Sequence, residues 1–260
     1  MLTVESDGVS LAVDVVGDGD PVTLVGHGLT GSRRDFALLA PFVPGTKVLF
    51  DFRGHGDSDR PPPGSYSMDH FAADVDNVAA AFGATSLVGV SLGGGATLRL
   101  LRSTPDRFER LVFILPARLG RSDAARAKLL RLADLLESRP IGEVAESIVV
   151  EEERDGLFDR FPGSKERRRE AILAMNGDGI PRAIREVIDD PPIPDPTPIR
   201  KVTVPALVVG QEGDPVHRAE VARDLAATLP HAELVLFDGR EAMLAQAAEL
   251  TQRVAAFLVR

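Results

Sequence analysis

The sequence predicts an α/β fold in which helices flank a mostly parallel central sheet, with a helical segment inserted between two of the later strands. Short apolar, β-branched runs alternate with longer stretches of helical periodicity, which is typical of parallel strands joined by crossover helices. The alternation stops between residues 118 and 198, where only helical patterns occur. A chain of 260 residues is long enough for one large domain carrying such an insertion.

Six apolar runs are expected to form buried strands, because strands of a parallel sheet are covered on both faces. They are residues 22–26, 47–52, 86–90, 111–115, 204–210 and 233–237. Residues 2–16 predict an antiparallel hairpin at one edge of the sheet. Ser67 can cap a helix with a buried apolar face, and further helices are expected over 216–229 and 247–258. The apolar face after Ser67 consists of Phe71, Val75, Val78, Ala79 and Phe82.

The interrupted region predicts a helical lid over residues 118–198, which leaves a core domain of residues 1–117 and 199–260. Its helical patterns cover residues 124–136, 141–150, 165–175 and 181–188. The proline-rich connector DDPPIPDPTPIRK closes it and cannot be helical. The lid is expected to cover an apolar cavity. Candidate lining residues are Leu129, Leu132, Leu136, Ile148, Leu157, Phe158 and Phe161.

The amino-acid composition limits the classes of partner that we expect for this protein. The formal net charge is −9 and the pI about 5.1, which argues against binding nucleic acid or an anionic membrane surface. The absence of cysteine excludes disulfides and a thiolate nucleophile. No signal peptide or apolar run of membrane-spanning length is evident. We therefore expect a cytoplasmic protein acting on a small molecule; the sequence does not indicate an oligomeric state.

The segment SLVGVSLGGG, residues 86–95, carries the strongest chemical signal. It is a strand followed by G-x-S-x-G and then a helical pattern, the context that gives this motif its meaning. A sharp strand-to-helix turn forces Ser91 into a strained conformation, and Gly89 and Gly93 let the two backbones approach. Ser91 is therefore the candidate nucleophile, held at the carboxyl edge of the sheet.

Two further motifs follow buried strands. LVGHGLTGS, residues 24–32, places His27 and Gly28 in a loop that would donate one backbone N–H to an oxyanion, with the residue after the nucleophile donating the other. These donors would be Leu29 and Leu92. We expect His27 to hold this loop by hydrogen bonds rather than act as a base. DFRGHGDSDRP, residues 51–61, suits a tight loop in which His55 is expected to be exposed.

The chain resembles the α/β-hydrolase fold superfamily over nearly its whole length. The resemblance is carried by the order and spacing of three motifs, the H-G loop, D-x-R-G-x-G-x-S and G-x-S-x-G. The resemblance implies a triad of nucleophile, acid and histidine in chain order. It implies that the acid lies in the loop after the strand at 204–210, where Asp214 is favoured over Glu212 because Asp-Pro presents the carboxylate in a turn. Dehalogenase and epoxide hydrolase relatives use aspartate where this chain has Ser91.

The histidine that the resemblance implies is missing. It should follow the last strand, near Arg240, Glu241 or Ala242, and none of these is histidine. His70 and His231 are expected to be structural or exposed. His217, three residues after Asp214, could share one face of a starting helix with it, but we expect it to cap or pack beside the acid loop. A carboxylate such as Glu241 is a poor base, since its usual pKa is too low.

Three functions remain open. The first is a hydrolase acting on a small, largely apolar ester, thioester or lactone through Ser91, with an atypical or incomplete triad. The second is a non-hydrolytic, cofactor-free cyclase, lyase or isomerase on the same scaffold. The third is a binding protein whose catalysis has decayed, against which the intact motifs argue. The sequence contains no metal-binding cluster or dinucleotide glycine motif, so we expect no metal and no cofactor.

Overall fold

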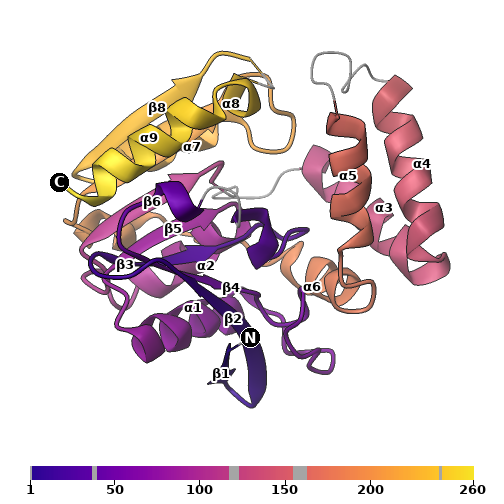
Figure 1. Cartoon of the computed structure of the whole chain (residues 1–260), viewed down its shortest axis with the longest axis horizontal. Helices are drawn as coiled ribbons and strands as arrows, with labels where there is room; N and C mark the ends of the chain where they lie inside the picture. The colour runs from indigo at the N-terminus through magenta and orange to yellow at the C-terminus, as the bar shows by residue number, and fades with distance from the viewer. Residues whose placement is uncertain (1, 37–39, 117–122, 155–162, 240–241) are drawn as a thin grey trace.

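The computed structural model describes residues 2–36, 40–116, 123–154, 163–239 and 242–260. Its centre is an eight-stranded sheet in the order β1-β2-β4-β3-β5-β6-β7-β8 (Figure 1). From β4 to β8 all neighbours are parallel, whereas β1, β2 and β4 pair antiparallel. The strands are β1 Leu2–Ser6, β2 Val9–Val16, β3 Val22–Gly26, β4 Thr46–Phe50, β5 Ser86–Val90, β6 Arg110–Ile114, β7 Ala206–Gln211 and β8 Ala232–Phe237. The predicted edge hairpin and mostly parallel sheet are confirmed.

Helices follow most strands, as the alternating pattern predicts. The α-helices are α1 Met68–Phe82, α2 Leu92–Leu101, α3 Asp123–Ser138, α4 Ile141–Arg154, α5 Ser164–Leu173, α6 Gly179–Val187, α7 Ala219–Thr228, α8 Ala242–Ala245 and α9 Ala247–Leu258. Short 3-10 helices are η1 Arg33–Phe36, η2 Ala40–Phe42 and η3 Thr197–Lys201. Among the described residues, no helix combines the length and apolar character needed to cross a membrane.

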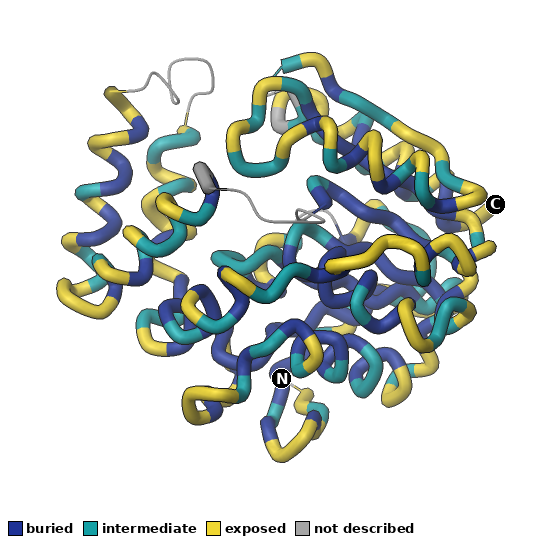
Figure 2. The backbone as a smooth tube through the Cα atoms, turned by 180° about the vertical axis from the view of Figure 1, so that it is seen from behind, coloured by how far each residue is buried: buried dark blue, intermediate teal, exposed yellow. Residues whose placement is uncertain are grey.

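The sheet is covered on both faces. One apolar cluster joins the strands to α1, α2 and α7 through residues such as Phe71, Leu98 and Leu225. A second joins the opposite face to α9 through Val254 and Phe257. Figure 2 shows the buried backbone concentrated in the sheet and the exposed segments around it. This two-sided burial explains why β3, β5, β6 and β7 are almost continuously apolar.

Ser67 caps α1 as the sequence predicts. Its hydroxyl accepts the His70 N–H, and the His70 side chain accepts the Ser67 N–H in return. This capping box satisfies two donors at the start of the helix. His70 is thus structural, as expected.

Helices α3 to α6 lie between β6 and β7 and form an apolar cluster of their own, which includes Ala133, Val144 and Ile180. In Figure 1, α3, α4 and α5 stand beside the sheet rather than on its faces. Helix α6 is fastened to the core, because the Glu186 carboxylate accepts the backbone N–H groups of Gly64 and Tyr66. The predicted helices are present; Leu157, Phe158 and Phe161 lie outside the described residues.

Candidate active site

Ser91 stands at the sharp turn between β5 and α2. Its φ of 47° and ψ of −103° lie in a region that non-glycine residues rarely adopt. The turn depends on close backbone approach: a Cβ on Gly89 would lie 2.8 Å from the carbonyl carbon of Gly93, and one on Gly93 would lie 2.4 Å from the Gly26 oxygen. These glycines therefore let α2 pack directly against β3 and β5, and the strained turn holds Ser91 at the carboxyl ends of the strands.

The imidazole of His217 lies between Ser91 and Asp214. Its Nε2 is 3.0 Å from the Ser91 Oγ, and its Nδ1 is 3.3 Å from an Asp214 carboxylate oxygen. This is the connectivity of a nucleophile, a base and an orienting acid. The expectation that His217 only caps or packs beside the acid loop is therefore wrong.

Asp214 is held by its own loop. One carboxylate oxygen accepts the backbone N–H groups of Val216 and His217 at 2.8 and 3.0 Å, and the other accepts the side-chain amide of Gln211 at 3.0 Å. Burial raises the pKa of Asp214, but the hydrogen bonds from His217 and Gln211 outweigh it and hold that pKa well below its usual value. Asp214 is thus an ionised partner for the imidazole.

The competing carboxylate, Glu212, does not face the site. It is partly exposed and pairs with Arg223 on α7. The structure thus brings Asp214, and not Glu212, to His217. The catalytic roles of Ser91 and Asp214 stay predictions.

The loop after β3 lies beside Ser91. A Cβ on Gly28 would be 3.7 Å from the Ser91 Cβ, and the Gly93 N–H donates to the His27 carbonyl at 3.0 Å. Within the described ranges, the backbone N–H groups of Leu29 and Leu92 donate to no other group of the protein. No described residue therefore competes for these two candidate oxyanion donors.

Two buried histidines support this loop. His27 Nδ1 donates to the Gly28 carbonyl at 2.7 Å, and its Nε2 accepts the Phe52 N–H at 3.1 Å. Burial and the neighbouring His55 hold the pKa of His27 well below its ordinary value, so it is a neutral ring with both nitrogens engaged. The prediction that His27 holds the loop is confirmed.

The expectation that His55 is exposed is wrong, because its side chain is fully buried. Its nitrogens face the carbonyls of Leu29 and Arg53 at 2.8 and 2.9 Å. The glycines on either side predict a tight turn, but they do not show that the turn folds inward against the neighbouring loop. His231 is exposed, as expected.

The missing histidine position lies partly outside the described residues, which exclude Arg240 and Glu241; Ala242 begins α8. The signal that could have identified His217 is its spacing from Asp214. The Asp214 carboxylate accepts the next two backbone N–H groups along the chain, and such a bond pattern turns the chain back on itself. The turn brings His217, the third residue after Asp214, beside the Asp214 carboxylate.

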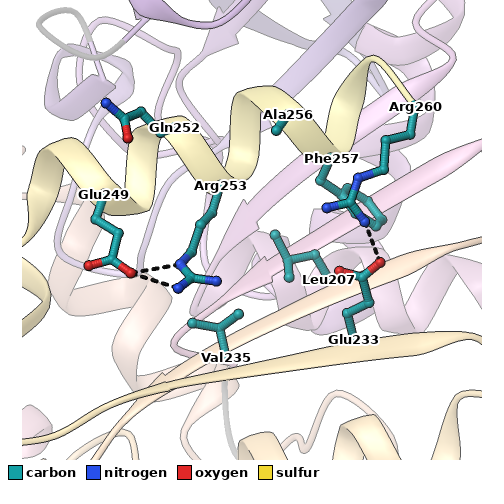
Figure 3. A pocket seen from close by; sticks show the side chains of 9 residues that line it. All are labelled: Leu207, Glu233, Val235, Glu249, Gln252, Arg253, Ala256, Phe257 and Arg260. Carbon is teal, nitrogen blue, oxygen red and sulfur yellow. Dashed lines mark hydrogen bonds and ion pairs between the residues drawn. The ribbon is translucent and has the colours of Figure 1, made fainter.

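A groove among the described residues lies elsewhere. It has a volume of about 310 Å³ between α9 and strands β7 and β8. Figure 3 shows two ion pairs among its lining residues, Glu249–Arg253 within α9 and Glu233–Arg260. Leu207 and Glu233 stand near the amino ends of their strands, whereas Ser91 follows the carboxyl end of β5. The cavity expected beneath residues 118–198 stays a prediction.

The fold and this geometry define an α/β protein with a serine–histidine–aspartate cluster at the carboxyl edge of its sheet. A model of the α/β hydrolase fold family matches residues 21–246. The chain therefore belongs to the α/β hydrolase fold family.

Individual relatives agree with this assignment. The chain is 37% identical over 106 residues to the sn-1-specific diacylglycerol lipase ABHD11 of Mus musculus, covering 37% of this chain and 34% of the lipase. A hydrolase from Pseudomonas aeruginosa PA01 superposes with a TM-score of 0.81 at 25% identity, over 98% and 96% of the two chains. The enol-lactonase from Burkholderia xenovorans LB400 gives a TM-score of 0.82 at 20% identity over 100% of both chains. The alignment with the lipase thus spans only about a third of that relative's length.

Proposed function

We propose that the protein is a serine hydrolase that cleaves small, largely apolar esters, thioesters or lactones. The observation that carries the proposal is the 3.0 Å contact between His217 Nε2 and Ser91 Oγ, with Asp214 on the other imidazole nitrogen. A serine hydroxyl becomes an effective nucleophile when such a base takes its proton. The names of the relatives, which include lipases, esterases and a lactonase, support acyl chemistry.

In the proposed reaction, Ser91 Oγ attacks the carbonyl carbon while His217 Nε2 accepts the hydroxyl proton. The N–H groups of Leu29 and Leu92 bind the oxyanion of the tetrahedral intermediate. His217 returns the proton to the departing alkoxide or thiolate, which leaves an acyl group on Ser91. Water then repeats these steps: it loses its proton to His217, attacks the acyl carbon and releases the acid and the free serine.

Asp214 acts through His217. Its carboxylate accepts the Nδ1–H, which leaves the Nε2 lone pair directed at Ser91 and stabilises the imidazolium that forms during the reaction. The non-hydrolytic alternative and the decayed binding protein both rest on the lack of a base, and the position of His217 beside Ser91 argues against that premise.

The helical segment of residues 118–198 is proposed as a lid. Its separate apolar cluster, together with the side chain of Leu29, which packs against both this cluster and the core, supports an apolar substrate. Such a lid would exclude water from the reacting carbonyl.

The test is hydrolysis of 4-nitrophenyl butyrate by the wild type and by Ser91→Ala and His217→Ala variants. Each variant is expected to lose about 10³-fold or more in kcat, because loss of either group disables the same step. His231→Ala, which removes an exposed histidine outside the site, is the control and should retain wild-type activity. A fluorophosphonate should label Ser91 in the wild type. Activity that survives Ser91→Ala would exclude this mechanism.

A further inference from the structure

The carbonyls of two consecutive peptide groups around Leu29 face buried imidazoles. The Gly28 carbonyl accepts from His27 Nδ1 at 2.7 Å and from the Gly31 N–H at 3.0 Å. The Leu29 carbonyl lies 2.8 Å from His55 Nε2. The Gly28 carbonyl and the Leu29 N–H belong to one trans peptide group and point in opposite directions, so fixing the carbonyl sets the direction of the N–H. Fixing the Leu29 carbonyl holds the next peptide group, so that this group cannot rotate the Leu29 N–H away.

His55 owes its position to a tight turn after β4. The turn needs left-handed backbone at Gly54 and Gly56, with φ of 72° and 48°, which glycine adopts without strain. A hydrogen bond from the His55 N–H to the Phe52 carbonyl at 3.0 Å closes it. The ring is fully buried, and its centroid lies 5.1 Å from that of the His27 ring, with the two planes tilted by 53°. The His55 side chain therefore cannot move far unless the turn that carries it also moves.

The same turn also contacts the joint between α5 and α6. Asn176 donates its side-chain amide to the Gly56 carbonyl at 3.4 Å, while its side-chain oxygen accepts the Gly179 N–H at 2.9 Å. Gly179 packs so closely that a Cβ there would lie 2.0 Å from the Gly54 oxygen. The helical segment and the loop after β3 thus both contact residues of the same turn.

We propose that His55 is a positioning residue in its Nε2–H tautomer, which donates to the Leu29 carbonyl at 2.8 Å rather than to the Arg53 carbonyl, and that docking of Asn176 on the Gly54–Gly56 turn keeps His55 in place. The inference rests on the proposed function, because it assigns the Leu29 N–H to an oxyanion hole. It adds a physical link between the helical segment and the group that stabilises the transition state.

The test replaces His55 with amides that imitate one ring nitrogen each. In His55→Gln the amide reaches the position of Nε2 and can still donate to Leu29. In His55→Asn it reaches only the position of Nδ1, so the bond to Leu29 is lost. Misplacing an oxyanion donor without removing it should cost less than the 10²–10³-fold of full removal. We expect kcat for 4-nitrophenyl butyrate to fall about 10–100-fold in His55→Asn with KM nearly unchanged, and to stay within about 3-fold in His55→Gln.

Inhibition by phenylboronic acid provides the second readout. Its adduct with Ser91 places a boronate oxygen where the oxyanion forms, so its inhibition constant should rise with the loss of kcat in His55→Asn. A purely structural role would lower the thermal midpoint of both variants without separating them in kcat. Equal kcat in folded His55→Asn and His55→Gln, or a larger loss in His55→Gln, would overturn the inference.

Asn176 tests the link from the other side. Asn176→Asp keeps the oxygen that accepts the Gly179 N–H but loses the donor to Gly56, so α6 keeps its first turn while the docking contact is broken. We expect a loss of about 3–10-fold in kcat, and an unchanged kcat would contradict the proposed link.

A crystal structure of His55→Asn separates this inference from the proposed function. A Leu29 peptide that keeps its direction would overturn the inference even if Ser91 is the nucleophile. A turned Leu29 peptide would support it even if Ser91→Ala left the ester hydrolysis unchanged.

Discussion

Every described hydrogen bond to the Asp214 carboxylate comes from residues 211–217. The acid and the proposed base therefore arise from one turn, which joins β7 to α7, and only Ser91 comes from elsewhere. None of these described hydrogen bonds comes from the segment after β8, where the resemblance to relatives places the histidine. One local loop thus supplies two of the three groups without a long-range loop closure.

The Asp214 carboxylate makes stability depend on pH. Its pKa is lowered from the ordinary 3.8, so the folded state binds its proton less readily than the unfolded chain. Stabilisation by the ionised group is complete above about pH 5 and is lost as the pH falls through 3.8 towards the folded-state pKa. We expect the free energy of unfolding to exceed that of Asp214→Asn most at neutral pH, and the difference to shrink between pH 5 and pH 2.

Urea unfolding of both proteins at several pH values measures this difference. A difference that stays constant between pH 5 and pH 2 would mean that the carboxylate is not stabilised by ionisation, and that Gln211 and His217 do not hold it as described.

At the same scale, the sequence predicts that Ser91 and Asp214 share one site but not that His217 lies between them. Ser91 lies in a motif whose glycines demand a particular backbone, so its position follows from local sterics. The direction of the His217 ring depends on the turn that Asp214 caps and on the distance from β7 to the end of β5. Both are properties of the folded sheet, which residue types and spacing do not specify.

At the scale of elements, the packing of α2 against β3 and β5 determines where Ser91 stands. Gly93 faces Gly26 with no room for a side chain, since a Cβ would meet the Gly26 oxygen at 2.4 Å and its carbon at 2.6 Å. Both contacts are to backbone atoms, which cannot move without shifting β3. The same shift would move Gly28 and the Leu29 N–H away from Ser91.

We expect Gly93→Ala to lower the free energy of unfolding by about 1–3 kcal/mol and to reduce kcat more than a surface change of equal size. Gly142→Ala is the matched control, because it lies in α4 and its added Cβ would meet nothing within 4 Å. Alanine there should be neutral or stabilising by up to about 1 kcal/mol. Thermal unfolding and ester hydrolysis measure both effects; equal behaviour of the two variants would contradict the role given to the close approach.

The spacing of apolar residues predicts the strands and helices well, because burial against the core determines that spacing. Strands β3 and β5 and helix α9 begin and end where the apolar pattern predicts, and α3 and α7 differ by only a few residues at their ends. The buried position of His55 is the exception. Its neighbours Gly54 and Gly56 indicate a turn, yet whether a turn faces solvent depends on the elements packed over it, in this case the loop at Leu29 and the joint before α6.

At the scale of the molecule, the chain has two apolar clusters against the sheet and a third within α3 to α6. The third cluster is smaller and is reinforced by exposed ion pairs. Arg185 joins α6 to Asp134 and Glu137 on α3, and Lys165 joins α5 to Glu153 on α4. Exposed pairs of this kind contribute about 0–1 kcal/mol each and weaken as salt rises.

Helix α5 is the least anchored of the four. Ile172 is its one buried residue, whereas α6 has six and is fastened to the core by Glu186. Local opening costs least where few apolar contacts resist it. We therefore expect the backbone amides of α5 to exchange with deuterium much faster than those of β5 and β6, with α6 between them.

Raising sodium chloride to about 0.5 M should speed exchange in α5 further, because salt screens its pairs with α4, while β6 stays unchanged. Hydrogen–deuterium exchange followed by mass spectrometry measures all three segments in one experiment. If α5 exchanges as slowly as β6 at both salt concentrations, the helical segment opens only with the whole domain, and a lid that admits substrate by local opening of α5 is excluded.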